Sequence, residues 1–197
     1  MALITIEGID GAGKSTLAAG LAAALPDAVL LREPGGVALA ERVRAVVMDP
    51  DLRVGPRAEA LLYAAARAQL VEEAVRPQLE AGRTVLLDRF VDSSLAYQGA
   101  GRGLGVEAVR AINDFGTGGL VPDRTLLLRL EPAVARARMG GRGVAADRLE
   151  AEGEDFFGAI AAAYDALAAA DPERWVVLDA TQPPDVLLDA ALGALGR

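Results

Sequence analysis

Eight residues near the start of the chain have the spacing of a phosphate-binding loop. The segment Gly8-Ile9-Asp10-Gly11-Ala12-Gly13-Lys14-Ser15 matches the pattern G-x-x-x-x-G-K-[ST]. Its glycines let the backbone turn so that consecutive N–H groups point at phosphate oxygens, and the following helix adds its positive N-terminal end. In this pattern the lysine reaches the β- and γ-phosphates, and the serine hydroxyl is offered to Mg²⁺. These residues favour phosphoryl transfer.

A carboxylate and an arginine stand together at the end of a second apolar segment. Asp88 and Arg89 follow Thr84-Val85-Leu86-Leu87, which has the character of a buried strand. Ligands of an open parallel sheet bind at the carboxyl ends of its strands, so Asp88 is a candidate to hold Mg²⁺ with Ser15. Arg89 beside it indicates that a second anion binds at this edge, in addition to the phosphates at the phosphate loop. Other arginines that could reach this edge are Arg32, Arg44, Arg67, Arg136, Arg138, Arg142 and Arg148.

The composition narrows the chemistry further. The 197 residues include no histidine and no cysteine, which removes the commonest general base and every thiolate metal site. Lys14 is the single lysine among 20 basic residues. A net charge of −8 argues against a nucleic-acid-coating protein. We expect no membrane span and no leader segment, and therefore a cytoplasmic protein.

Short apolar runs alternate with longer amphipathic ones, which predicts an α/β fold with a parallel sheet between helices. We expect one domain over residues 1–197, a three-layer sandwich with five strands. The expected strands are 2–7, 28–32, 83–88, 124–130 and 174–179. The expected helices lie near 14–24, 37–48, 57–81, 92–98, 105–115, 132–139, 152–170 and 183–195. The glycine-rich basic stretch 139–146 fits either a surface loop or an active-site lid.

Several motifs occur in an order that resembles the bacterial thymidylate kinase family over essentially the whole chain. Besides the phosphate loop they are Arg32-Glu33-Pro34-Gly35-Gly36, Tyr63-Ala64-Ala65-Ala66-Arg67, Asp88-Arg89-Phe90, Asp92-Ser93-Ser94-Leu95-Ala96-Tyr97-Gln98-Gly99, Asp147-Arg148-Leu149-Glu150 and Asp179-Ala180-Thr181-Gln182-Pro183. The resemblance implies a P-loop kinase with a short lid at about residues 139–151. It also implies transfer of a phosphoryl group from ATP to dTMP with Mg²⁺, and a homodimer.

The same resemblance implies roles for individual residues. Lys14, Arg89, Asp10 and Arg142 would be catalytic. Gly11 occupies the loop position where some members carry an arginine, so that charge would come from the lid, with Arg142 the first choice and Arg138 and Arg148 next. The residues implied for ATP are Gly8, Ile9, Asp10, Gly11, Ala12, Gly13, Lys14, Ser15, Thr16, Arg138, Thr181 and Gln182. The residues implied for dTMP are Asp10, Glu33, Pro34, Arg44, Tyr63, Arg67, Arg89, Ser94, Tyr97 and Gln98.

Within the dTMP set, Asp10 would face the sugar 3′-hydroxyl and Tyr97 would crowd the 2′ position. Tyr63 would stack on thymine, with Arg67 at the base edge and Ser94 and Gln98 at the ring. Arg44 and Arg89 would clamp the phosphate.

Two other functions remain to be weighed. A kinase for another nucleoside monophosphate, or for a deoxynucleoside, shares the phosphate loop and much of the chemistry. A nucleotide-dependent switch of the GTPase type needs an Asn-Lys-x-Asp segment, and the chain has no lysine besides Lys14 to form one. The sequence therefore favours an enzyme over a switch.

Overall fold

The computed structural model describes residues 1–140, 148–149 and 152–196. Five strands form one sheet in the order β2-β3-β1-β4-β5, and every neighbouring pair is parallel. The strands are β1 (Ala2–Glu7), β2 (Ala28–Arg32), β3 (Thr84–Asp88), β4 (Arg124–Arg129) and β5 (Trp175–Asp179). Each lies within one residue of the range expected from the sequence, and the α/β fold class is confirmed.

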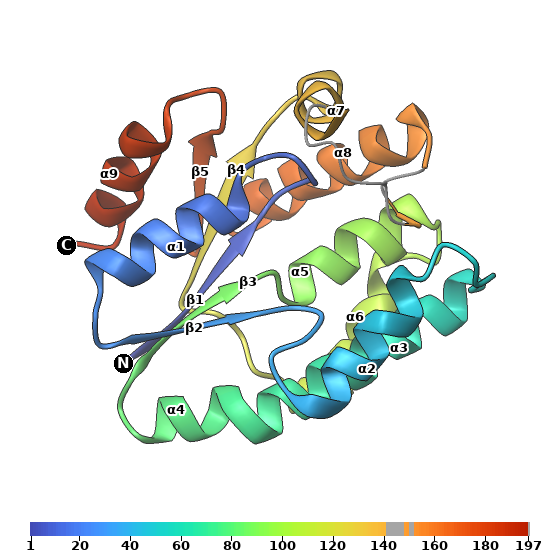
Figure 1. Ribbon diagram of the computed structural model, residues 1–197, viewed down its shortest axis with the longest axis horizontal. Coiled ribbons are helices and arrows are strands. Elements are labelled where there is room, and N and C mark those ends of the chain that lie inside the picture. Colours follow the sequence, from blue (N-terminus) through green and yellow to red (C-terminus); the bar gives the residue numbers. More distant parts are fainter. Residues whose placement is uncertain (141–147, 150–151, 197) are drawn as a thin grey trace.

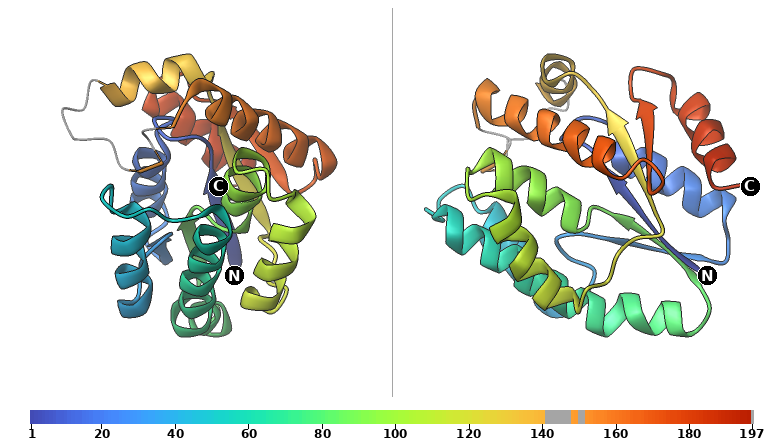
Figure 2. Two further views of the ribbon diagram at one scale, coloured as in Figure 1. Left: turned by 90° about the vertical axis from the view of Figure 1, so that its right-hand side faces the viewer. Right: turned by 180° about the vertical axis from the view of Figure 1, so that it is seen from behind.

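Helices cover both faces of the sheet. Figures 1 and 2 show α1 and α9 together on one face and α8 on the other. The helices are α1 (Lys14–Ala24), α2 (Ala38–Met48), α3 (Pro56–Leu70), α4 (Arg76–Glu80), α5 (Val91–Ser94), α6 (Val106–Thr117), α7 (Pro132–Gly140), α8 (Glu154–Ala170) and α9 (Pro184–Ala194). Two π-helical turns, η1 (Val71–Val75) and η2 (Leu95–Gly101), continue α3 and α5. The described helices thus reproduce the expected pattern.

The side chains of the central strands alternate between two apolar layers, as the two-residue period of a strand requires. Leu3, Val85 and Leu87 pack with Val71 and Val75 of η1. Each fully buried aliphatic side chain of this kind stabilises the fold by about 1.5–3 kcal/mol. This layer therefore fixes the α3–η1–α4 segment, and with it the cavity-lining residues on α3, against the sheet.

The opposite layer lies beneath α1. Ile4, Ile6 and Leu86 of the sheet pack in one cluster with Leu17 and Leu21 of α1. Burial on both faces explains why β1, β3 and β4 read as almost continuous apolar runs. α1 is consequently held with its first turn at the carboxyl end of β1.

The strand order indicates where this sheet can bind a ligand. β1 pairs with β3 on one side and β4 on the other, so successive connections leave β1 in opposite directions. The crevice outside such a switch point is where open α/β sheets bind ligands. Ile6 of β1 and Arg32 of β2 both align with Asp88, so three strands end side by side there. Across the described residues, no helix has both the length and the apolar character needed to cross a bilayer.

Candidate active site

The segment between β1 and α1 has the backbone of a phosphate loop. Gly8, Gly11 and Gly13 all have positive φ angles, of 142°, 84° and 98°, which side chains disfavour. A Cβ on Gly8 would lie 2.7 Å from the carbonyl oxygen of Leu128. α1 begins at Lys14, so the N–H groups of its first turn lack partners within the helix and are available to an anion.

Lys14, Asp10 and Arg89 form a compact group of charges at this loop. The Lys14 Nζ donates to the carbonyl oxygen of Ile9 at 2.9 Å and lies 3.8 Å from Asp10 Oδ1. Burial, with the Arg89 charge second, lowers the pKa of Lys14 to about 8. Burial alone would raise the pKa of Asp10, but the charges of Arg89 and Lys14 hold it well below its usual value. Because negative charge favours the protonated amine, a phosphate at the loop would keep Lys14 cationic.

Arg89 is held in an unusual backbone conformation directly after β3. Its φ of 71° is the one positive value among the described non-glycine residues, and such strain collects at functional sites. Its Nη2 donates to Asp10 Oδ1 at 2.5 Å, and its Nη1 donates to the carbonyl oxygen of Gly8 at 3.2 Å and to Ser93 Oγ at 3.1 Å. The guanidinium also stacks 5.0 Å from the ring centre of Tyr97. These contacts hold the guanidinium of Arg89 beside the phosphate loop.

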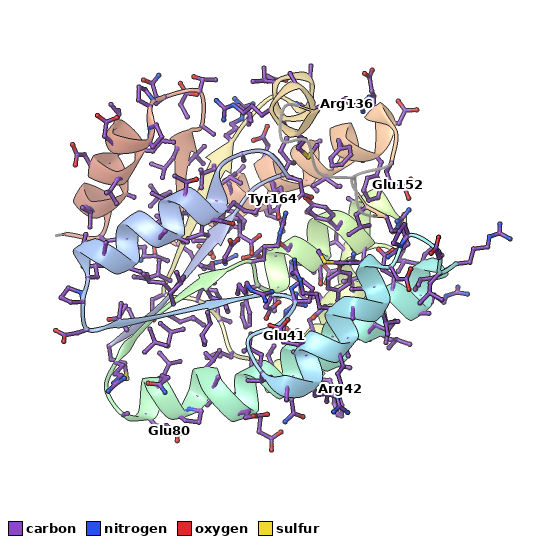
Figure 3. The ribbon with its side chains drawn as sticks, in the orientation of Figure 1. Glu41, Arg42, Glu80, Arg136, Glu152 and Tyr164 are labelled. Atoms are coloured by element: carbon purple, nitrogen blue, oxygen red, sulfur yellow. The ribbon has the colours of Figure 1, made fainter. Side chains whose placement is uncertain are left out.

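Glu7, at the end of β1, supports this turn from beneath. Its Oε1 accepts from the N–H of Phe90 at 2.8 Å, and its Oε2 accepts from Ser93 Oγ at 2.6 Å and Tyr164 Oη at 2.9 Å. Tyr164 reaches this point from α8, into the interior of the molecule (Figure 3). Burial, reinforced by the charge of Asp92, raises the pKa of Glu7 to about 7. The carboxyl group therefore links the strained turn to the core.

The loop after β2 is fixed by a carboxylate of α2. Glu41 Oε1 accepts from the N–H of Gly36 and from Arg32 Nη2, both at 2.8 Å, which lowers the pKa of Glu41. The carbonyl oxygen of Pro34 then accepts from Arg32 Nη1 at 3.1 Å and from Arg44 Nη1 at 3.0 Å. The guanidiniums of Arg32 and Arg44 therefore meet at the carbonyl oxygen of Pro34, and both residues line the cavity described below.

One cavity of about 530 Å³ joins these features. Most residues expected at the two substrates or the metal line it, from seven segments of the chain. They are Asp10, Gly11, Gly13, Lys14, Ser15, Thr16, Glu33, Pro34, Arg44, Tyr63, Arg67, Asp88, Arg89, Ser94, Tyr97, Gln98 and Arg138. Arg32, Met48, Ser93 and Leu149 line it too, without having been assigned to a substrate from the sequence.

Arg67 sits in the cavity wall with its hydrogen-bonding capacity already engaged. The side chain is 2% exposed, and it donates to Glu33 Oε2, Ser94 Oγ, the side-chain oxygen of Asn113 and the carbonyl oxygen of Phe90. Since Nη2 also lies 2.6 Å from Glu33 Oε2, these acceptors account for all five N–H donors of a guanidinium. Arg67 therefore fixes the positions of the neighbouring side chains, in addition to lining the cavity.

Ser15 and Asp88 form an oxygen-rich pair at the phosphate loop. Ser15 Oγ donates to Asp88 Oδ2 at 2.9 Å, and both residues line the cavity. Hydroxyl and carboxylate oxygens are the ligands that a hard cation prefers. The described residues hold no group of three or more acidic side chains placed to bind a metal. The pair could therefore hold a cation only together with oxygens from a ligand or water.

α7 closes over the phosphate loop at Gly11. A Cβ on Gly11 would lie 2.5 Å from the carbonyl oxygen of Ala135, so this packing excludes a side chain there. Arg138, near the end of α7, lines the cavity, whereas Arg136 pairs with Glu154 of α8 at 3.3 Å. Arg142 and most of the expected lid lie outside the described residues.

A few expected site residues do not line the cavity. Gly8, Ile9 and Ala12 contribute to the shape of the phosphate loop from behind. The side chains of Thr181 and Gln182 donate to Asp179 at the end of β5. Those two residues therefore stabilise a turn at the end of β5, and their contact with a nucleotide stays a prediction.

Sequence reasoning overlooked two buried carboxylates, Glu7 and Glu59. Glu7 ends an apolar strand immediately before the phosphate loop. An acidic residue at the end of a buried strand could have indicated a carboxyl group with a role at the site. Glu59 precedes Tyr63 by one helical turn, but nothing in its neighbours along the chain reveals that its side chain is fully buried. Its partners are Gln98 of η2, Arg102 directly after η2, and Arg148, all of them 39 residues or more away in the chain.

Comparisons with known proteins agree in one family. The family model described as thymidylate kinase matches residues 6–190. A thymidylate kinase of Deinococcus radiodurans is 51% identical over 93% of this chain and 91% of that protein, and one of Desulfovibrio desulfuricans is 50% identical over 94% and 91%. The crystal structure of thymidylate kinase from Ehrlichia chaffeensis superposes with a TM-score of 0.80 at 25% identity, covering 100% of this chain and 98% of that one.

Proposed function

Because the chain belongs to the thymidylate kinase family, we propose that it transfers the γ-phosphoryl group of ATP to dTMP, giving ADP and dTDP. The resemblance noted in the sequence is confirmed by the family match, and with it the assignment as a nucleotide-dependent kinase. In a cell this reaction supplies the precursor of dTTP for DNA synthesis.

The observation that carries this proposal is one cavity lined by two unlike sets of residues. The phosphate loop contributes Lys14 and Ser15, which suit the phosphates of ATP. Tyr63 and Gln98 contribute an aromatic ring and an amide, which suit a base. Arg89 lines the same cavity and contacts both Asp10 of the phosphate loop and Tyr97, so it can meet the phosphate of an acceptor beside the donor.

We assign the acceptor within this cavity from the residues that line it. Tyr63 stacks on thymine and Ser94 and Gln98 bind its edge, while Glu33 and Pro34 border the pocket. Arg44 and Arg89 clamp the phosphate of dTMP from two sides. Asp10 takes the 3′-hydroxyl of the sugar, and Tyr97, whose hydroxyl donates to Asp10 Oδ2 at 2.8 Å, crowds the 2′ position.

The chemistry needs no general base. The nucleophile is a phosphate oxygen of dTMP. The second pKa of this phosphate group is about 6, so the group is mostly doubly ionised at neutral pH. This agrees with a chain that lacks histidine. The remaining barrier comes from aligning two anions that repel each other. Lys14, Arg89 and a lid arginine, with Arg142 the first candidate, neutralise the negative charge of their phosphates.

We also propose that the enzyme works with Mg²⁺ bound through Ser15 and Asp88. The two oxygens are already within 2.9 Å of each other at the phosphate loop, and Mg²⁺ commonly takes one or two protein oxygens together with substrate phosphates and water. The ion would neutralise charge on the phosphates of ATP during transfer.

A panel assay tests the proposed function. Purified protein with ATP and Mg²⁺ is given dTMP, dUMP, dCMP, dAMP, dGMP and thymidine, and ADP and the nucleotide products are separated by chromatography. We expect dTDP formation with dTMP as the preferred acceptor. Preference for another monophosphate, or for thymidine, would replace the proposal with one of the two alternative kinases.

We further propose that the protein is a cytoplasmic homodimer with ATP and dTMP as its small-molecule partners and no nucleic acid or membrane partner. Large apolar side chains are exposed on α3 and α6, including Leu61 at 57% and Phe115 at 92%. Covering them in a dimer would remove apolar surface from water. Sedimentation at micromolar concentration should give a dimer, and a monomer would contradict this part of the proposal.

A further inference from the structure

Glu59 is a fully buried carboxylate that touches the acceptor side of the cavity through another residue. It belongs to α3 and has no exposed surface. Its Oε1 accepts from Gln98 Nε2 at 2.9 Å and from Arg102 Nε at 3.2 Å, and its Oε2 accepts from Arg102 Nη2 at 3.2 Å and lies 2.7 Å from Arg148 Nη1. Gln98 lines the cavity and Glu59 does not.

The charge of Glu59 decides which way the amide of Gln98 faces. Both oxygens of Glu59 face N–H donors, and a carboxylate paired with two guanidiniums can only accept hydrogen bonds. Turning the amide over would place its oxygen against Glu59 Oε1, and two acceptors would then face each other in a buried site. Gln98 Oε1 is therefore directed away from Glu59, and within the described part of the chain no donor engages it.

Ser94, one helical turn before Gln98, has the opposite hydrogen-bonding role. Its Oγ accepts from Arg67 Nη1 at 2.9 Å, so the hydroxyl hydrogen is left to donate elsewhere. Both Ser94 and Gln98 line the cavity. A free donor therefore stands beside a free acceptor, which matches a pyrimidine that carries a ring N–H next to a carbonyl group. Thymine and uracil have that pattern, and cytosine has an acceptor nitrogen beside an amino group.

We propose that Glu59 is a positioning residue that determines base specificity, by holding Gln98 with its carbonyl oxygen toward the acceptor base. This inference rests on the proposed function, since it assumes that Gln98 meets the base of dTMP. Arg102 and Arg148 pair with Glu59 and fix its position. Glu59 itself does not touch the base, and its effect is transmitted through the orientation of one amide.

Glu59→Gln tests the inference because a neutral amide at this position can either accept or donate. Gln98 can then turn over, so the cavity loses its preference for a ring N–H. We expect kcat/KM for dTMP to fall about tenfold relative to kcat/KM for dCMP, the size of one mismatched hydrogen bond. The loss should lie mainly in KM for dTMP, with KM for ATP unchanged.

A double variant separates this role from a merely structural one. In a Gln98→Leu background there is no amide to turn, so adding Glu59→Gln should leave the ratio of the dTMP and dCMP activities unchanged. Glu152→Gln is the matched control, because it breaks the Arg102–Glu152 pair at 2.5 Å without touching Gln98. Glu152, labelled in Figure 3, lies near the start of α8, and its variant should keep the wild-type ratio.

Glu59→Asp covers the case in which Glu59→Gln fails to fold. The shorter side chain keeps the negative charge between the two arginines but loses reach to Gln98, so the ratio should fall as for Glu59→Gln. A wild-type ratio in a folded Glu59 variant would overturn the inference, as would an equal effect of Glu59→Gln in the Gln98→Leu background. Failure of the wild-type protein to phosphorylate dTMP would instead refute the proposed function, and this inference with it.

Discussion

Replacing Glu7 with Gln should change how the stability of the protein depends on pH. The folded state raises the pKa of Glu7 to about 7 from an ordinary value of 4.5, chiefly because the carboxyl group is buried. Between these values the folded protein holds a proton that the unfolded chain has released. The contribution of Glu7 to stability is therefore fully present below pH 4.5 and is lost as pH rises through about 7.

The size of the effect follows from the pKa difference. A difference of about 2.5 units corresponds to about 3 to 4 kcal/mol, at about 1.4 kcal/mol per unit. Gln at position 7 stays neutral at every pH and resembles the protonated acid. Its oxygen can still accept from the N–H of Phe90, and the hydroxyls of Ser93 and Tyr164 can rotate to accept from its amide. The variant should therefore gain stability relative to wild type as pH rises.

Urea unfolding at half-unit steps from pH 4.5 to 8.5, followed by the fluorescence of the buried Trp175, measures this difference. Subtracting wild type from variant at each pH removes the contribution of groups common to both. Glu41→Gln is the control of opposite sign and is measured from pH 4.5 down to about pH 3: hydrogen bonds lower the pKa of that exposed carboxyl, so wild type should lose its advantage over the variant only as pH falls below the ordinary value of 4.5. A difference between Glu7→Gln and wild type that stays constant from pH 4.5 to 8.5 would refute the reasoning.

Three further substitutions probe the site. Lys14→Met should lower kcat by about 10²-fold or more while the melting temperature stays close to that of wild type, and near-normal turnover would show that the loop is not the donor site. Tyr97→Phe removes the 2.8 Å hydrogen bond to Asp10 and should lower kcat/KM for dTMP about tenfold with little effect on KM for ATP, as measured by steady-state kinetics. Ser15→Ala should raise the Mg²⁺ concentration needed for half-maximal activity about tenfold, and an unchanged Mg²⁺ titration would remove Ser15 from the metal site.

The sheet and the phosphate loop could be predicted because their determinants are local. Apolar runs such as Val85-Leu86-Leu87 fit a strand buried on both faces, and Gly8, Gly11 and Gly13 stand where the backbone adopts positive φ. Ser15 and Asp88 were expected together because parallel strands end at one edge. Their 2.9 Å contact follows from the sheet order.

The polar network behind the site could not be predicted in the same way. Arg67 was expected at a base edge, but its five donors are committed to partners between 23 and 46 residues away in the chain. Glu59 depends likewise on Gln98, Arg102 and Arg148, which only the tertiary structure brings to this part of α3. Such contacts arise from tertiary structure, and no periodicity in the sequence marks them.

The backbone conformation of Arg89 could not be predicted from the sequence either. A non-glycine residue with φ of 71° has no signature in the sequence, and the conformation persists because Glu7 binds the next residue and Asp10 binds the guanidinium. The sequence singled out the side chain of Arg89 at the end of β3. The structure adds the reason that this side chain turns toward the phosphate loop.

A crystal structure with dTMP bound tests the central claim most directly, which is that one cavity holds the acceptor opposite the phosphate loop. The account predicts thymine stacked on Tyr63 with its ring N–H at Gln98 Oε1, and the phosphate between Arg44 and Arg89. The 3′-hydroxyl should lie at Asp10. A base located away from Tyr63 and Gln98, or a phosphate out of reach of Arg89, would contradict it.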